Sequence, residues 1–107
     1  MYVIGLDVGT TAGKAIVFDL EGKIKGYSFG GYDVIIKKPN WVEQDPEKLW
    51  EIARNVIRKV IKDTNLKDIK AICVSVQGDA VIPVDSKIRP LHNAIFCLFY
   101  TSPSPRD

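Results

Sequence analysis

The sequence predicts an α/β domain built on a mixed β-sheet, with the element order βββαβ. Three short apolar runs separated by turn residues open the chain. One amphipathic helix follows, and after it comes an uninterrupted apolar run that suits a strand lying parallel to an earlier one. A helix between two strands of one sheet is typical of an α/β domain, so the sheet should be mixed.

The first strands are expected to form an antiparallel meander. Residues 2–8 and 14–20 are β-branched and apolar, and a glycine-threonine turn separates them. The next turn contains Gly22, where a positive φ is expected. The third strand is predicted from about residue 24 to residue 36, with a bulge or bend at Gly30-Gly31.

A loop and a well-marked helix follow the meander. Residues 39–46 show no periodicity and predict a loop. Asp45 suits the N-cap of a helix, and Pro46 suits its first position, where the missing N–H costs nothing. Apolar residues then recur every three or four positions, which predicts an amphipathic helix over 46–63. Asn65 is a suitable C-terminal cap.

The segment after the helix predicts further strands. Residues 69–76 form a continuous apolar run, which favours a strand buried on both faces with Cys73 as a buried free thiol. Residues 80–84 predict a fifth strand that ends in a turn at 85–87. A sixth short element is expected near Ala94-Ile95.

The last residues differ from the rest of the chain. Residues 97–107 are rich in proline and serine and cannot hold regular structure. They read either as a disordered natural terminus or as translated sequencing-adapter read-through, and the second interpretation is favoured. The predicted domain is therefore residues 1–96, with 97–107 as an artefactual or disordered tail.

Composition excludes several classes of function. A net charge of +2, from 15 basic and 13 acidic residues, gives no case for nucleic acid or for an anionic membrane surface. No apolar stretch approaches the ~20 residues that cross a bilayer. The two cysteines lack metal-ligand spacing and predict neither a disulfide framework nor a zinc site. A reducing cytoplasm is the expected location.

The first candidate site follows the first strand. Asp7 stands at the strand end, and Gly9 lets a ligand approach the backbone closely. Thr10 and Thr11 offer hydroxyl groups and consecutive N–H groups, with Lys14 beyond them. This pattern suits the β- and γ-phosphates of a nucleotide, with Asp7 holding Mg²⁺ directly or through water. A plain hairpin whose aspartate caps the turn explains the same residues equally well.

The second candidate site follows the strand predicted over 69–76. Gln77, Gly78 and Asp79 come at the carboxyl end of that strand, where open α/β sheets bind ligands. Gln77 and Asp79 can form hydrogen bonds with sugar hydroxyls, and Gly78 leaves room for the ligand. A polar turn between two strands remains the alternative.

Three segments, in this order, resemble the FGGY family of carbohydrate kinases. Residues 5–11 with Lys14 look like the first phosphate motif of that family. Residues 40–46 look like its Gly-Trp-Val-Glu-Gln-Asp-Pro segment, with Asn40 in place of the glycine. Residues 75–81 look like its sugar-contacting segment. Each motif alone is short, but three in the same order indicate the family.

The resemblance implies the N-terminal part of the first domain of an actin-like ATPase, or ribonuclease H-like, fold. It implies transfer of the γ-phosphoryl group of ATP to a sugar or polyol hydroxyl with Mg²⁺. The residues it places around the metal and the phosphates are Asp7, on the metal side, and Gly9, Thr10, Thr11 and Lys14. Gln77 and Asp79 would face the sugar. Gly78-Asp79 replaces the Met-His pair of many members, which favours a polyol or another keto sugar over xylulose.

The resemblance also implies that the chain is a fragment without activity of its own. The catalytic base of the family is an aspartate far downstream of the residues present, so no residue of this chain is expected to be catalytic. A homodimer is one state expected for the full-length parent. Two alternatives stay open: an actin-like or chaperone-type nucleotide-binding module without sugar chemistry, or a short binding module if the tail is natural.

Overall fold

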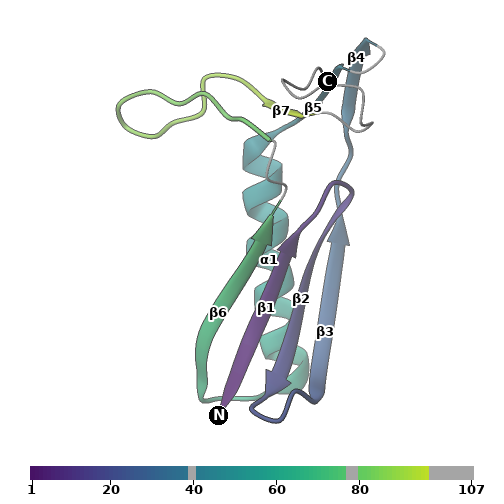
Figure 1. Cartoon of the computed structure of the whole chain (residues 1–107), viewed down its shortest axis with the longest axis vertical. Helices are drawn as coiled ribbons and strands as arrows, with labels where there is room; N and C mark the ends of the chain where they lie inside the picture. Colours follow the sequence, from purple (N-terminus) through teal and green to yellow (C-terminus); the bar gives the residue numbers. More distant parts are fainter. Residues whose placement is uncertain (39–40, 77–79, 97–107) are drawn as a thin grey trace, which may run out of the picture.

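The computed structural model describes residues 1–38, 41–76 and 80–96. Its elements are β1 (Tyr2–Val8), β2 (Ala12–Asp19), β3 (Ile24–Gly31), β4 (Ile35–Lys38), β5 (Trp41–Gln44), α1 (Pro46–Thr64), β6 (Ile69–Val76) and β7 (Ala94–Phe96). The strands form a four-stranded sheet of order β3-β2-β1-β6 and a three-stranded sheet of order β4-β5-β7 (Figure 1). The large sheet is packed against α1, and the small sheet lies beyond one end of the large sheet (Figure 1).

The large sheet confirms the predicted mixed topology. β1, β2 and β3 form an antiparallel meander, and β6 pairs with β1 in parallel after the α1 crossover. In the β2–β3 turn Gly22 has a φ of 86°, as expected. The backbone N–H groups of Lys23 and Glu21 both donate to the Asp19 carboxylate. These hydrogen bonds, of which the one from Lys23 has the larger effect, lower the pKa of Asp19.

Helix α1 follows its predicted bounds closely and covers one face of the meander. Asp45 accepts a hydrogen bond from the Glu47 N–H at 2.9 Å, and Asn65 closes the helix in a left-handed conformation. Its buried face packs on the inward side chains of β1 and β2, and the resulting core contains Ile4, Leu6, Ala15, Val17, Ala53, Val56 and Val60. Among the described residues, no helix combines the length and hydropathy of a membrane span.

The third predicted strand, over 24–36, is in fact two strands in different sheets. β3 ends at Gly31 in the large sheet, and β4 begins at Ile35 in the small one. The predicted bulge is also misplaced, because the β2–β3 register shifts at Lys25 whereas Gly30 and Gly31 stay in the ladder. A glycine suits position 30 because α1 packs closely on it: a Cβ there would lie 3.3 Å from the Ile52 Cγ2 of the helix.

The loop predicted over 39–46 contains a strand. Residues 41–44 form β5, the central strand of the small sheet, and residues 39–40 lie outside the described residues. The partner β7 comes fifty residues later in the chain, where Gln44 pairs with Ala94. A four-residue strand held by such a distant partner leaves no local period, which explains the wrong prediction.

The strand at 69–76 is confirmed as a parallel strand but is not buried. β6 forms the edge of the sheet, and its apolar residues Ile72, Val74 and Val76 are 50%, 53% and 62% exposed. Cys73, predicted to be buried, is exposed. The reason is the position of α1, which packs on β1, β2 and β3 and leaves β6 uncovered in the part of the chain that the structure describes.

In place of the fifth predicted strand, over 80–84, the structure has two isolated β-bridges. Val81 bridges to Ile95, and Val84 bridges to Pro90. The turn predicted at 85–87 is present, because the Asp85 carboxylate accepts the N–H groups of Arg89 and Lys87. These hydrogen bonds lower the pKa of Asp85, and the one from Arg89 has the larger effect. The element predicted near Ala94-Ile95 is confirmed as β7.

Candidate functional site

The β1–β2 turn brings together the five residues predicted to bind phosphate and metal. The turn is closed by a hydrogen bond of 3.0 Å from the Gly9 N–H to the Ala12 carbonyl. Asp7 is exposed on the face of the sheet opposite α1, because Leu6 before it and Val8 after it pack toward the helix. Asp7 pairs with Lys14 on β2 and with Ser75 on β6, so these three residues share that face.

The carbonyl groups of the turn are held by two residues that approach from behind it. The Gln44 Nε2 donates to the Thr10 carbonyl at 2.7 Å, and Gln44 itself is 1% exposed. The Tyr32 hydroxyl donates to the Gly9 carbonyl and, at 3.3 Å, to the Ala12 carbonyl. The Tyr32 N–H donates to the Thr11 carbonyl at 3.1 Å. Every carbonyl from Gly9 to Ala12 therefore has a donor.

The opposite side of the turn is open. Within the part of the chain that the structure describes, the N–H groups of Thr10 and Thr11 donate to no backbone carbonyl. A Cβ on Gly9 would lie 3.2 Å from the Ala12 carbonyl oxygen and 3.8 Å and 3.9 Å from the Asp7 carboxylate oxygens. The contact with the Ala12 carbonyl oxygen would be tight, whereas those with Asp7 would be ordinary van der Waals contacts, so a side chain at position 9 would press on the backbone of the turn.

The donor set at the turn fits a magnesium ion that arrives with a phosphate ligand. Asp7 contributes one carboxylate, and the described residues contain no group of three or more His, Cys, Asp or Glu side chains. Mg²⁺ commonly binds through one or two carboxylates plus substrate phosphates and water, rather than in a cage made by the protein alone. The turn suits that mode of binding.

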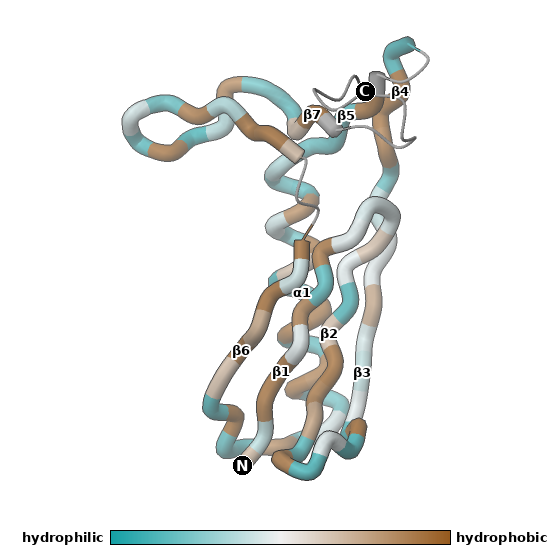
Figure 2. The backbone as a smooth tube through the Cα atoms, in the orientation of Figure 1, coloured by the Kyte–Doolittle hydropathy of each residue, from teal (hydrophilic) through white to brown (hydrophobic). Residues whose placement is uncertain are grey.

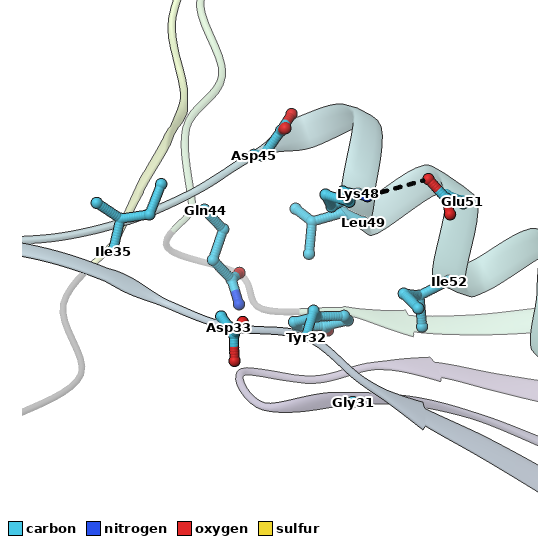
Figure 3. A pocket seen from close by; sticks show the side chains of 10 residues that line it. All are labelled: Gly31, Tyr32, Asp33, Ile35, Gln44, Asp45, Lys48, Leu49, Glu51 and Ile52. Atoms are coloured by element: carbon cyan, nitrogen blue, oxygen red, sulfur yellow. Dashed lines mark ion pairs between the residues drawn. The ribbon is translucent and has the colours of Figure 1, made fainter.

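A cavity of about 330 Å³ lies behind the two residues that hold the turn. Figure 3 shows the Gln44 amide extending from the end of β5 toward Tyr32, with the first turns of α1 on the other side. The lining residues are Gly31, Tyr32, Asp33, Ile35, Gln44, Asp45, Lys48, Leu49, Glu51 and Ile52. Lys48 and Glu51 form an ion pair of 3.6 Å across its rim.

Gln77, Gly78 and Asp79, predicted to contact the sugar, lie outside the described residues. β6 ends just before them at Val76, which pairs with Val8 at the end of the sheet that carries the phosphate turn. A second cavity, of about 320 Å³, opens at this end and is lined by Val8, Leu49, Trp50, Ala53, Val76, Ala80 and Ile82. Trp50, in the first turns of α1, is 61% exposed and forms part of this lining.

The buried carboxylate of Glu43 links the strands of the small sheet. Glu43 is 1% exposed, and its Oε1 lies 3.5 Å from the Lys37 Nζ. The Asn93 side-chain amide donates to the same oxygen at 3.1 Å. Glu43 of β5 is thus bound to residues of β4 and of the segment that leads into β7. This pairing satisfies a charge that would otherwise be costly to bury.

Tyr32 and Gln44 are not among the residues that the sequence predicts for the phosphate turn. Each comes from a segment whose path depends on the small sheet, so no local pattern places it near Thr10. The signal that the sequence offers is the Gly30-Gly31 pair, at which β3 ends just before Tyr32. A chain that leaves a sheet at a glycine pair can direct the following side chain into a neighbouring turn.

Comparison with known proteins identifies related sequences and structures. Residues 2–99 match the family described as FGGY family of carbohydrate kinases, N-terminal domain. Glycerol kinase of Aquifex aeolicus is 44% identical over 94 residues, which make up 87% of this chain and 19% of that protein. The crystal structure of gluconate kinase from Lactobacillus acidophilus matches 88% of this chain and 19% of its own chain, with a TM-score of 0.81 and 33% identity.

A structure with a bound nucleotide is also similar. The crystal structure of Plasmodium falciparum glycerol kinase with ADP has a TM-score of 0.79 and 29% identity, over 88% of this chain and 20% of that chain. In each comparison the chain spans about a fifth of the length of its relative.

Proposed function

Because this chain belongs to the FGGY family of carbohydrate kinases, we propose that it supplies the phosphate-binding turn of an ATP-dependent kinase whose acceptor is a sugar or polyol hydroxyl. Its fold is part of the actin-like, ribonuclease H-like N-terminal domain of that family. The observation that carries the proposal is the β1–β2 turn, whose carbonyls are held from behind and whose open side lies next to Asp7.

In this proposal each residue of the turn has a distinct role. The N–H and hydroxyl groups of Thr10 and Thr11 donate to the β- and γ-phosphates of ATP. The Asp7 carboxylate holds Mg²⁺, which when bound offsets the negative charge of the phosphates. Lys14, the cross-strand neighbour of Asp7, adds positive charge on the same face.

The acceptor is proposed to bind at Gln77, Gly78 and Asp79. Two observations support this location: these residues follow β6, and β6 ends beside β1 at the end of the sheet that carries the turn. The 44% identity with a glycerol kinase supports a polyol as the acceptor. No specific observation favours the alternative of a filament or chaperone-type nucleotide module. A cytoplasmic location and a homodimeric parent belong to the same proposal.

The proposal is tested by titrating the isotope-labelled chain with ATP and Mg²⁺ and following the amide resonances. We expect the Thr10 and Thr11 resonances to move to saturation, and the Mg²⁺-dependent part of the affinity to be lost in Asp7→Asn. Asp33→Asn is the matched control, since it removes an exposed carboxylate that lies on the cavity behind the turn. Unchanged Thr10 and Thr11 resonances in the wild-type chain would contradict the proposal.

The chain alone is expected to show no phosphoryl transfer to glycerol above the level of an Asp7→Ala variant. The reason is that the chain spans about a fifth of the length of the kinases to which it is similar. Turnover well above that control would contradict this expectation.

A further inference from the structure

The β1–β2 turn owes its open side to contacts made on its closed side. Among the described residues, the donors that reach its carbonyls from outside the hairpin are Tyr32, on the chain that passes from β3 to β4, and Gln44, the last residue of β5. Neither residue belongs to the hairpin that they hold. The conformation of the turn therefore depends on the small sheet as well as on its own sequence.

The orientation of the carbonyls decides the orientation of the amides. In a trans peptide the C=O and N–H groups point in opposite directions, so a carbonyl held on one side of the turn turns the following N–H to the other side. The Thr10 carbonyl held by Gln44 and the Gly9 carbonyl held by Tyr32 precede the N–H groups of Thr11 and Thr10. Consecutive N–H groups turned the same way form an anion-binding concavity.

We propose that Gln44 and Tyr32 are positioning residues for nucleotide phosphate: they orient the peptide groups of Gly9 to Ala12 and thereby set the affinity of the turn for the phosphate chain. The inference rests on the proposed function, because it concerns how the same turn binds phosphate. Neither residue touches the ligand, and both act through the backbone of the turn.

The surroundings of the two side chains suit this role. Gln44 is almost fully buried, so its amide keeps one orientation instead of exchanging partners with solvent. Tyr32 is partly buried, and its hydroxyl lies within hydrogen-bond distance of both the Gly9 and the Ala12 carbonyls, which fixes it against the turn.

Two shape-preserving substitutions remove the donors. Gln44→Met keeps the length and volume of the side chain, which matters because a shorter residue would let water from the adjacent cavity take over the lost hydrogen bond. Tyr32→Phe removes only the hydroxyl. Ser28→Ala is the matched control, since the buried Ser28 hydroxyl donates to the Val56 carbonyl of α1 and makes no contact with the turn.

The probe is tripolyphosphate with Mg²⁺, because it carries the charges of the phosphate chain and needs no contact with adenine. Binding to the full 107-residue chain is followed through the Thr10 and Thr11 amide resonances, and the melting temperature of each variant is measured in parallel. We expect Gln44→Met and Tyr32→Phe each to weaken binding about fivefold, the ratio that corresponds to one hydrogen bond. Ser28→Ala should lower the melting temperature and leave the affinity unchanged.

The outcomes separate the inference from the proposed function. Wild-type affinity in both donor variants, or an equal loss in Ser28→Ala, overturns the inference and leaves the proposed function intact. If both donor variants unfold while Ser28→Ala stays folded, the two donors are structural only and the inference is also overturned. A wild-type chain that does not bind tripolyphosphate at Thr10 and Thr11 overturns both.

Discussion

At the scale of single residues, Gly26 shows how closely α1 approaches the sheet. A Cβ on Gly26 would lie 2.3 Å from the Cγ2 of Thr64 in the last turn of the helix, well inside contact distance. We therefore expect Gly26→Ala to lower the free energy of unfolding by about 1–3 kcal/mol, the usual range for an overpacked contact. Equilibrium denaturation in urea measures this change.

The double variant Gly26→Ala with Thr64→Ser is the control for this prediction. Serine lacks the Cγ2 but keeps the hydroxyl that donates to the Val60 carbonyl at 2.7 Å. Most of the loss should therefore be recovered in the double variant. An equal loss with and without the threonine methyl group would mean that the contact is not the cause.

Among the residues at the site, those close together in the chain are predicted from the sequence, whereas Gln44 is not. Asp7, Gly9 and Thr10 are neighbours in the chain, and a short strand-turn pattern is enough to bring them together. Gln44 is 34 positions from its partner Thr10, and its polar side chain next to the Asp45 cap looks like ordinary loop chemistry. Its role depends on burial by the small sheet, which no local pattern in the sequence reports.

At the scale of elements, the N-terminal cap of α1 makes a clear prediction. The Asp45 carboxylate accepts the Glu47 N–H, and Pro46 occupies the first helical position. We expect Asp45→Ala to lower the free energy of unfolding by about 1 kcal/mol, because a helix N–H loses its acceptor. Asp45→Ser, which keeps a capping oxygen, should retain most of the stability. Similar losses in both variants would show that the carboxylate acts in some way other than capping.

Elements with strong local signals are the ones that the sequence predicts well. The helix is marked by its cap, its proline and its apolar spacing, and the meander by its turns. β5 and β6 fail for different reasons. β5 is a strand only because β4 and β7 pair with it, whereas the apolar run of β6 correctly predicts a parallel strand but wrongly implies cover on both faces. Pairing partners and covering layers are properties of the assembled fold.

At the scale of the whole molecule, the chain buries less of itself than a closed domain does. Its accessible surface of 7663 Å² exceeds the roughly 6,000 Å² typical of a folded chain of its mass. Its radius of gyration of 16.1 Å exceeds the roughly 13 Å of a compact domain of this length. Figure 2 shows hydrophobic residues along β6, one of the two edge strands of the large sheet.

This open edge predicts self-association of the isolated chain. In the part of the chain that the structure describes, no strand pairs with the outer edge of β6, and its apolar side chains are exposed. Together these features favour pairing between copies. We expect Val74→Lys to raise the monomer fraction, because a charge on the exposed edge opposes pairing. Sedimentation velocity measures the distribution of species. Leu20→Lys is the control, since Leu20 is similarly exposed but lies in the turn between β2 and β3, outside the strands. An equal effect of both variants would mean that added charge alone is responsible.

The positions of Tyr32 and Gln44 along the chain have a consequence for synthesis. Both residues precede α1, so the two side chains that hold the carbonyls of the β1–β2 turn are translated within the first 44 residues. The parallel pairing of β1 with β6 must wait for some thirty more residues and closes a much longer loop, which is a slower event. On the ribosome, where chains fold from the N-terminus, the β1–β2 hairpin and the two residues that hold it are therefore available before the large sheet can be completed.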